Sequence, residues 1–224
     1  DLTLGRPISE FTRGRLTLKM ENTTYDYISG NVAEVPGDYN NRTIGFGVNT
    51  NTVDHPFFPT EGYKNDAYLE LGARVLGGDS QYTKLRLEHS RFFEVRDGGY
   101  VLALRGLGGR LLGGTFESTD EHFKIGGADT LRGYSYGDTE LGLAGDHMLV
   151  MNAEFRFPIV EKLQGVVFSD WGTAWDRGET LQLTDLHNSF GLGVRLDTPL
   201  GLLRLDYGWG KDVDANRTGQ FYFG

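Results

Sequence analysis

The chain of 224 residues contains no cysteine, so it can form neither a disulfide framework nor a thiolate metal site. Its 5 histidines are scattered without the spacing of a metal site, and we expect neither a metal nor another cofactor. No apolar run approaches the roughly 20 residues of a membrane-spanning helix, which excludes a helical membrane protein. The chain opens directly on strand-like sequence, without the charged and apolar segments typical of a signal peptide, so we expect none in this sequence.

Basic residues are too few for a nucleic-acid partner. The chain has 22 lysines and arginines against 31 aspartates and glutamates, a net charge of −9, whereas phosphate backbones require a basic surface. Apolar side chains make up only 38% of the residues, and 33 residues are glycine. This composition is poor for a packed soluble core of such length and suits a sheet with one apolar and one wet face.

Helical periodicity is nearly absent, whereas apolar and polar residues alternate along many segments. In the segment 188–197, apolar side chains occupy the even positions from 190 to 196, and polar or glycine residues occupy the odd ones. Turns of hairpin type, rich in glycine and aspartate, stand at 36–38, 77–79 and 97–99. The alternation predicts about eleven strands, at 2–8, 13–25, 42–52, 63–75, 81–93, 99–112, 148–157, 162–175, 188–197, 203–210 and 218–223.

Two all-β architectures fit such long antiparallel strands. In a soluble sandwich the apolar faces point inward, and in a transmembrane barrel they meet lipid while the polar faces line a lumen. The barrel is favoured because the polar faces carry glycine and charges of both signs, and because the strands match the 9 to 11 residues of a tilted membrane strand. Aromatic residues near strand ends are typical of the girdles of such barrels: Trp171, Trp175, Tyr207, Trp209 and Phe223.

One long loop between predicted strands stands out, at 125–138 with the sequence IGGADTLRGYSYGD. It is too rich in glycine for a helix and too long for a tight turn. Ordering such a loop costs conformational entropy, and a loop of this kind usually serves a function. Its single arginine, Arg132, needs an acidic partner, and parity along the strands puts Glu154 on a polar face. Asp170 shares its face with Phe168, so the polar and apolar residues of its strand are separated less clearly between the two faces.

Six motifs, in order along the whole chain, resemble the C-terminal part of BamA-like outer-membrane assembly and translocation barrels. This superfamily, of the bacterial surface antigen type, also includes the TamA proteins and the two-partner-secretion transporters. The motifs are Arg6-Pro7, the NTVD and FPTEG segments at 51–54 and 58–62, the loop motif GG…LRGY at 126–134, EFRFP at 154–158, FSDWG at 168–172, and the paired final strands at 189–206.

The resemblance implies a bacterial outer-membrane location and a barrel of sixteen strands preceded by POTRA domains. Residues 1–224 would then be the C-terminal part of one barrel domain, without POTRA domains. An odd strand count is unusual for a single-chain barrel. We therefore expect further strands before Asp1 and a few further residues after Gly224.

The resemblance also implies that the loop folds into the lumen, where Arg132 pairs with acidic residues of the inner wall, here Glu154 and Asp170. We refer to Gly126, Gly127, Arg132, Gly133 and Tyr134 as the latch. The three glycines are suited to positive φ and close approach. Tyr134 and Tyr136 either pack the loop against the wall or are ordinary loop aromatics.

The final segment resembles the strand that closes the barrel against its first strand. We expect Gly219, Phe221 and Phe223 to belong to this closing strand. In the family that seam can open sideways to lipid. The implied function is to fold and insert other barrel proteins into the outer membrane. Its partners would be membrane lipid, unfolded outer-membrane proteins as clients, and accessory lipoproteins or periplasmic chaperones.

Two alternatives stay open: a polypeptide-secreting transporter of two-partner or TamA type, and the barrel anchor of an outer-membrane enzyme. The chain itself is not predicted to be an enzyme. His89 and Ser90 are strand neighbours and would point to opposite faces. His187 and Ser189 share a face, but no third residue that would orient the histidine is identifiable.

Overall fold

The computed structural model describes residues 1–24, 39–115, 121–199, 201–214 and 216–224. Eleven strands form one antiparallel sheet, in the order β1-β2-β3-β4-β5-β6-β9-β10-β11-β12-β13. Their bounds are β1 Leu2–Pro7, β2 Thr12–Thr23, β3 Tyr39–Asn51, β4 Gly62–Gly72, β5 Gln81–Arg96, β6 Tyr100–Thr115, β9 His147–Val160, β10 Leu163–Trp175, β11 His187–Thr198, β12 Gly201–Lys211 and β13 Arg217–Phe223. The predicted all-β antiparallel fold is confirmed.

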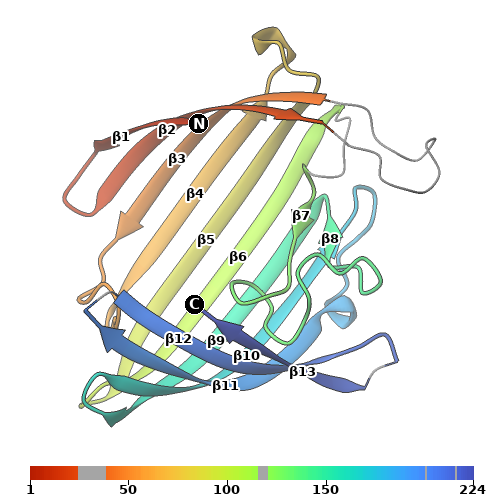
Figure 1. Cartoon of the computed structure of the whole chain (residues 1–224). Coiled ribbons are helices and arrows are strands. Elements are labelled where there is room, and N and C mark those ends of the chain that lie inside the picture. The colour runs from red at the N-terminus through yellow and green to blue at the C-terminus, as the bar shows by residue number, and fades with distance from the viewer. Residues whose placement is uncertain (25–38, 116–120, 200, 215) are drawn as a thin grey trace.

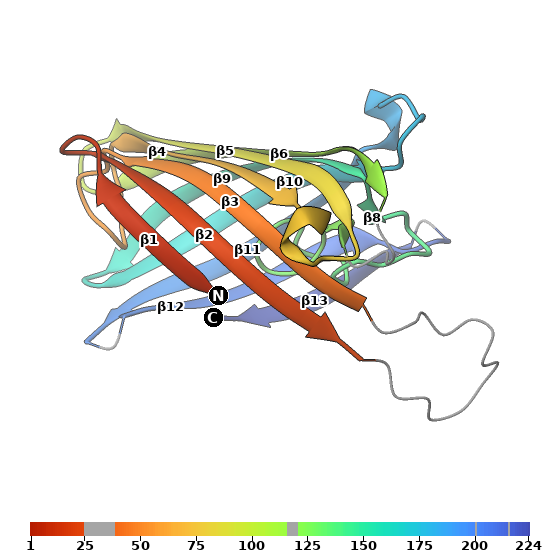
Figure 2. The same cartoon turned by 90° about the horizontal axis from the view of Figure 1, so that it is seen from above.

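The sheet curls into a trough whose two edges are β1 and β13 (Figures 1 and 2). Strands that follow one another in the chain are neighbours in the sheet. The one interruption comes after β6, whose neighbour is β9, because β7 and β8 form a separate sheet. Residues 121–146, which precede β9 and are called the inward segment, lie on the concave side of the sheet, and the short strands β7 (Phe123–Lys124) and β8 (Ala144–Gly145) pair at the base of this segment. No helix in the described ranges is long and apolar enough to cross a membrane.

One predicted strand was too long. The segment predicted at 63–75 ends as a strand at Gly72, and Arg74–Leu76 form the 3-10 helix η2, which places Val75 in solvent. Gly77 then ends this turn in the left-handed region, at φ 83°. A second short 3-10 helix, η4, covers Leu183–Asp185. The predicted turn at 36–38 lies outside the described residues.

The polarity of the sheet is the inverse of that of a soluble sandwich. Large apolar side chains on the convex face are exposed, among them Leu192 at 54% and Phe221 at 74%. Charged side chains on the concave face are buried, with Asp170 and Asp206 at 0%. Water would penalise this arrangement on both faces, whereas a bilayer outside and a filled lumen inside satisfy it.

The lumen also contains an apolar cluster that the alternation of the strands did not predict. The inward segment supplies five of its buried side chains: Phe123, Ile125, Leu131, Tyr134 and Leu143. They pack against inward-facing residues of the wall, including Leu107 of β6 and Val150 of β9. The loop therefore fills part of the lumen as a small hydrophobic core, which helps to offset the entropy of ordering it.

Replacing Leu192 by arginine is expected to destabilise the protein by about 2–4 kcal/mol, because an arginine on the lipid face of a barrel enters hydrocarbon. The matched control is Val213→Arg, which puts the same charge at an exposed apolar position between β12 and β13. It should change stability by less than about 0.5 kcal/mol. Urea unfolding of the protein in lipid vesicles measures both, and equal destabilisation would mean that the convex face does not meet lipid.

Candidate functional site

The inward loop is shaped by its own backbone before it touches the wall. Gly137 donates to the carbonyl of Ile125 and Gly127 donates to that of Tyr134, each at 2.8 Å. The Thr130 hydroxyl bridges both backbone groups of Gly126, at 2.6 and 2.8 Å. Gly126, Gly127 and Gly133 all have positive φ, at 108°, 77° and 88°, a conformation that other residues rarely adopt. The loop therefore presents Arg132 at its inner end in a defined position.

Arg132 binds three carboxylates on three different strands. Its Nε and Nη2 donate to the two oxygens of Asp170 on β10, each at 2.8 Å, in bidentate geometry. Its Nη1 donates to Glu154 on β9 at 2.7 Å and to Asp206 on β12 at 3.2 Å. The structure thus brings Arg132 together with both residues proposed from the sequence, and with a third that was not proposed.

The guanidinium also lies over an aromatic ring. The Cζ atom of Arg132 is 3.4 Å from the ring centroid of Phe168, which is buried on β10. Delocalised guanidinium groups stack well on aromatic faces, and lysine would lose both this stacking and the bidentate pairing. A Cβ at Gly191, on the neighbouring strand β11, would lie 2.2 Å from Phe168 Cζ, so glycine there leaves room for the ring.

The site is balanced in charge. Arg156 binds Glu154 at 2.7 Å, and Arg195 binds Asp206 at 2.5 Å and Glu154 at 3.5 Å. Three arginines therefore face three carboxylates, as buried charges require. Asp206 and Arg195 were not expected at the site from the sequence, although both stand in the final-strand motif. Parity put each on a polar face, but only the curvature of the sheet brings β11 and β12 to the latch.

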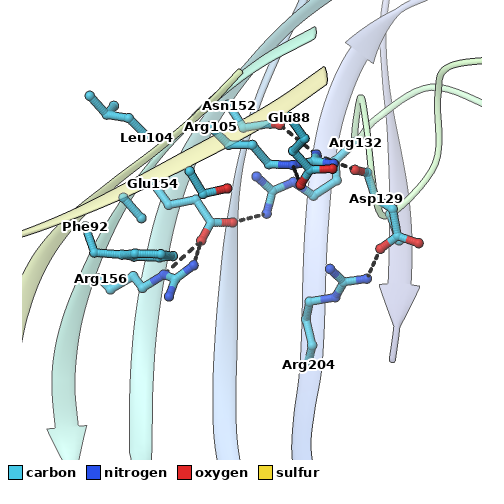
Figure 3. A pocket seen from close by; sticks show the side chains of 13 residues that line it. Glu88, Phe92, Leu104, Arg105, Asp129, Arg132, Asn152, Glu154, Arg156 and Arg204 are labelled. Atoms are coloured by element: carbon cyan, nitrogen blue, oxygen red, sulfur yellow. Dashed lines mark hydrogen bonds and ion pairs between the residues drawn. The ribbon is translucent and has the colours of Figure 1, made fainter. Parts of the chain in front are cut away.

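The loop tip is held by a second group of contacts, shown in Figure 3. Arg105 of β6 donates to the carbonyl of Asp129 at 2.7 Å and binds Glu88 of β5 at 2.7 Å. Arg204 of β12 binds the exposed Asp129 carboxylate at 2.9 Å. These side chains, together with Arg132, Glu154 and Arg156, line a pocket of about 350 Å³.

The chain matches one known protein family over its whole length. The Omp85 superfamily domain matches residues 1–224. The chain belongs to the Omp85 superfamily. This barrel is accordingly located in an outer membrane, as the names of its relatives also indicate.

Two Omp85 relatives illustrate the range of the superfamily. The chain is 35% identical over 143 residues to outer envelope protein 80 of the Arabidopsis thaliana chloroplast, covering 60% of this chain and 17% of that protein. It is 32% identical over 185 residues to the outer membrane protein assembly factor BamA of Nitratidesulfovibrio vulgaris, covering 77% of this chain and 23% of that protein. The chain thus spans about a fifth of the length of these relatives.

Solved structures agree with the fold. BamA from Haemophilus ducreyi, in a form lacking POTRA domains 1–3, matches 99% of this chain and 52% of its own, with a TM-score of 0.76 and 20% identity. CdiB from Acinetobacter baumannii matches 99% of this chain and 40% of its own, with a TM-score of 0.67 and 19% identity. At such identities the likeness concerns the Omp85 barrel fold alone.

The two loop tyrosines have different surroundings in this Omp85 barrel. Tyr134 is buried, its hydroxyl donates to the carbonyl of Asn188 at 2.9 Å, and its ring meets His187 edge-on at 5.6 Å. Tyr136 is 67% exposed, so the suggestion that it packs against the wall is wrong. It lies between Tyr134 and Leu143, two buried members of the apolar cluster, in a part of the loop that faces away from that cluster.

The three residues expected in the closing strand, Gly219, Phe221 and Phe223, lie away from the latch. On β13, Gly219 lies opposite Trp209, and Phe221 lies opposite Tyr207. Phe221 and Phe223 are exposed on the convex face. Gly219 makes room for the Tyr207 ring, because a Cβ there would lie 2.0 Å from its hydroxyl. These side chains therefore belong to the lipid-facing surface of the Omp85 barrel.

Only one of the two histidines considered from the sequence, His187, contacts a latch residue among the described contacts. His89 contacts Asn65, and His187 packs against Tyr134. Ligand atoms of His122, Asp146 and Asp176 lie within 4.8 Å of one another, a grouping that sequence spacing did not reveal. The Arg177 guanidinium is 3.4 Å from the Asp146 carboxylate and already supplies a cation, so we assign no metal to this cluster.

Asp170→Asn is expected to destabilise the protein by about 3–5 kcal/mol, since it removes the bidentate partner of a buried arginine. Asp129→Asn is the matched control on the inward loop, because this carboxylate is 85% exposed and binds only the rim residue Arg204 among the described contacts. It should cost at most about 1 kcal/mol. Urea unfolding compares the two, and similar losses would contradict the assignment of the buried site as the anchor of the loop.

Proposed function

We propose that this chain is the C-terminal part of an outer-membrane assembly barrel that folds and inserts other β-barrel proteins, without nucleotide or metal. The observation that carries the proposal is the burial of Arg132 among carboxylates of β9, β10 and β12. The BamA relative at 32% identity supports the same activity. Residues 1–224 would form part of a single barrel domain without POTRA domains.

The latch acts by fixing the shape of the wall next to the final strands. One guanidinium bonded to three strands opposes any change in their mutual spacing. A buried ion cluster adds little net stability compared with an apolar cluster, but removing one member leaves a charge without compensation. The latch therefore favours one arrangement of β9 to β12 strongly without being the main source of folding energy.

The edge strand supplies the reactive element of an insertase. β13 pairs with β12 over Arg217–Phe223, and in this proposal its other edge closes the barrel at a seam that can open. Backbone N–H and C=O groups on such an edge can pair with an incoming strand. In this proposal, the clients are unfolded outer-membrane proteins, whose strands are templated at β13 while the latch keeps the neighbouring wall in shape.

A second candidate, a polypeptide-secreting transporter, is favoured by one observation. The CdiB fold covers 99% of this chain with a TM-score of 0.67. In that case the inward loop would obstruct a path through the lumen. Ion conductance that is blocked by an exported polypeptide, with unchanged levels of other barrel proteins, would favour the transporter over the insertase.

Depletion of the protein in its host tests the proposed insertase. Levels of folded outer-membrane barrels are expected to fall several-fold, to be restored by the unmodified gene and not by Arg132→Met. The control is Arg15→Met, which removes an arginine bound to Asp66 on another part of the wall, and it should restore the levels. Steady barrel levels on depletion would contradict the insertase, and full restoration by Arg132→Met would contradict the role of the latch.

A double-mutant cycle tests the direct pair. Arg132→Met and Asp170→Asn should be non-additive by about 1–3 kcal/mol in unfolding free energy, because each removes the same interaction. Arg132→Met and Asp66→Asn, whose carboxylate binds Arg15 at 2.7 Å on another part of the wall, should add within about 0.5 kcal/mol. Additivity in both cycles would mean that Arg132 and Asp170 do not stabilise each other.

A further inference from the structure

The inward loop contacts the last strand as well as the arginine site. The backbone N–H of Gly133 donates to the hydroxyl of Tyr222 on β13 at 2.8 Å. That hydroxyl lies 2.8 Å from Gln220 Oε1 and 3.2 Å from the carbonyl of Tyr134, and it can donate to either. The Gln220 amide in turn donates to the Ser135 hydroxyl at 3.3 Å. Three consecutive loop residues thus bond to two inward-facing side chains of β13.

Glycines let the loop backbone reach this strand. A Cβ on Gly133 would lie 2.4 Å from the backbone nitrogen of Gly210 on β12. A Cβ on Gly210 would lie 2.3 Å from the Gly133 carbonyl oxygen, and one on Gly208 would lie 2.9 Å from the Gly133 nitrogen. The loop therefore rests directly on the backbone of β12, at a distance that no other residue type permits at these three positions.

The two sets of contacts meet at one point of the sheet. Asp206 of β12 and Tyr222 of β13 are direct cross-strand partners. Arg132 binds Asp206, and the next residue, Gly133, binds Tyr222. Two adjacent loop residues therefore hold two opposite residues of the β12–β13 ladder, so that β13 cannot move away from β12 without breaking a contact to the loop.

We propose that Tyr222 is a positioning residue that couples the last strand to the arginine latch. Through its hydroxyl, movement of β13 loosens Gly133, and release of Arg132 loosens β13. The inference rests on the proposed function, in which β13 is the strand that pairs with clients. If β13 pairs with a client, the resulting movement of β13 would reach the loop in the lumen through the Tyr222 hydroxyl.

Hydrogen–deuterium exchange of the protein in lipid nanodiscs tests the coupling. Tyr222→Phe keeps the ring and removes the hydroxyl, so exchange should rise about 3- to 10-fold both at Gly133 and along β13, the change expected for one ordinary hydrogen bond. The matched control is Tyr207→Phe on β12, whose hydroxyl lies against Gly219 and away from the loop. It should leave exchange at Gly133 unchanged.

Combining Arg132→Met with Tyr222→Phe distinguishes coupling between the latch and β13 from a purely structural role of Tyr222. Arg132→Met should raise exchange along β13 when Tyr222 is present and add little in the Tyr222→Phe background. Unchanged exchange at Gly133 in Tyr222→Phe would overturn the proposal, as would an undiminished effect of Arg132→Met on β13 in that background. The measurement needs no client, so loss of the insertase assignment in the depletion experiment would leave the coupling itself intact.

Discussion

The contact on which the rest of the structure depends is the bidentate pair between Arg132 and Asp170, with Glu154 and Asp206 beside it. An arginine side chain remains charged under all ordinary conditions, and it is buried at 4% exposure. It must therefore keep these partners or draw water into the lumen. In our proposal, that requirement fixes the position of the inner end of the loop, and the loop in turn fixes how β9, β10 and β12 are spaced.

The inverted polarity of the sheet explains why such a site exists here. Strands that show lipid an apolar face must turn their polar face inward, where side chains are close together and have little water. Pairing every charge with its opposite is the solution for this interior, as the three arginines and three carboxylates show. The inward loop adds apolar residues, among them Ile125 and Leu143, that pack against inward-facing apolar residues of the wall such as Leu107 and Val150.

Local periodicity in the sequence was sufficient to predict the number and approximate positions of the strands, and for most of them the polar face. Alternation located the strands of the sheet, and parity placed Glu154 on the lumenal face. It could not reveal Asp206 and Arg195 as site residues, because their approach to the latch depends on the curvature of the whole sheet. The contact between Gly133 and Tyr222 joins residues 89 positions apart and was equally hidden. The sequence left open whether Tyr134 and Tyr136 pack against the wall, since residue type alone does not say where a loop turns outward; Tyr134 is buried and Tyr136 is exposed.

The most direct test of the account is the distance between two spin labels, one at Tyr136→Cys on the inward loop and one at Val75→Cys on η2. Both positions are exposed, and the chain has no other cysteine. With Arg132 in place, the account predicts a single narrow distance distribution, which broadens markedly in Arg132→Met because the loop tip is released. A distribution that stays equally narrow without the arginine would contradict the claim that this side chain holds the loop.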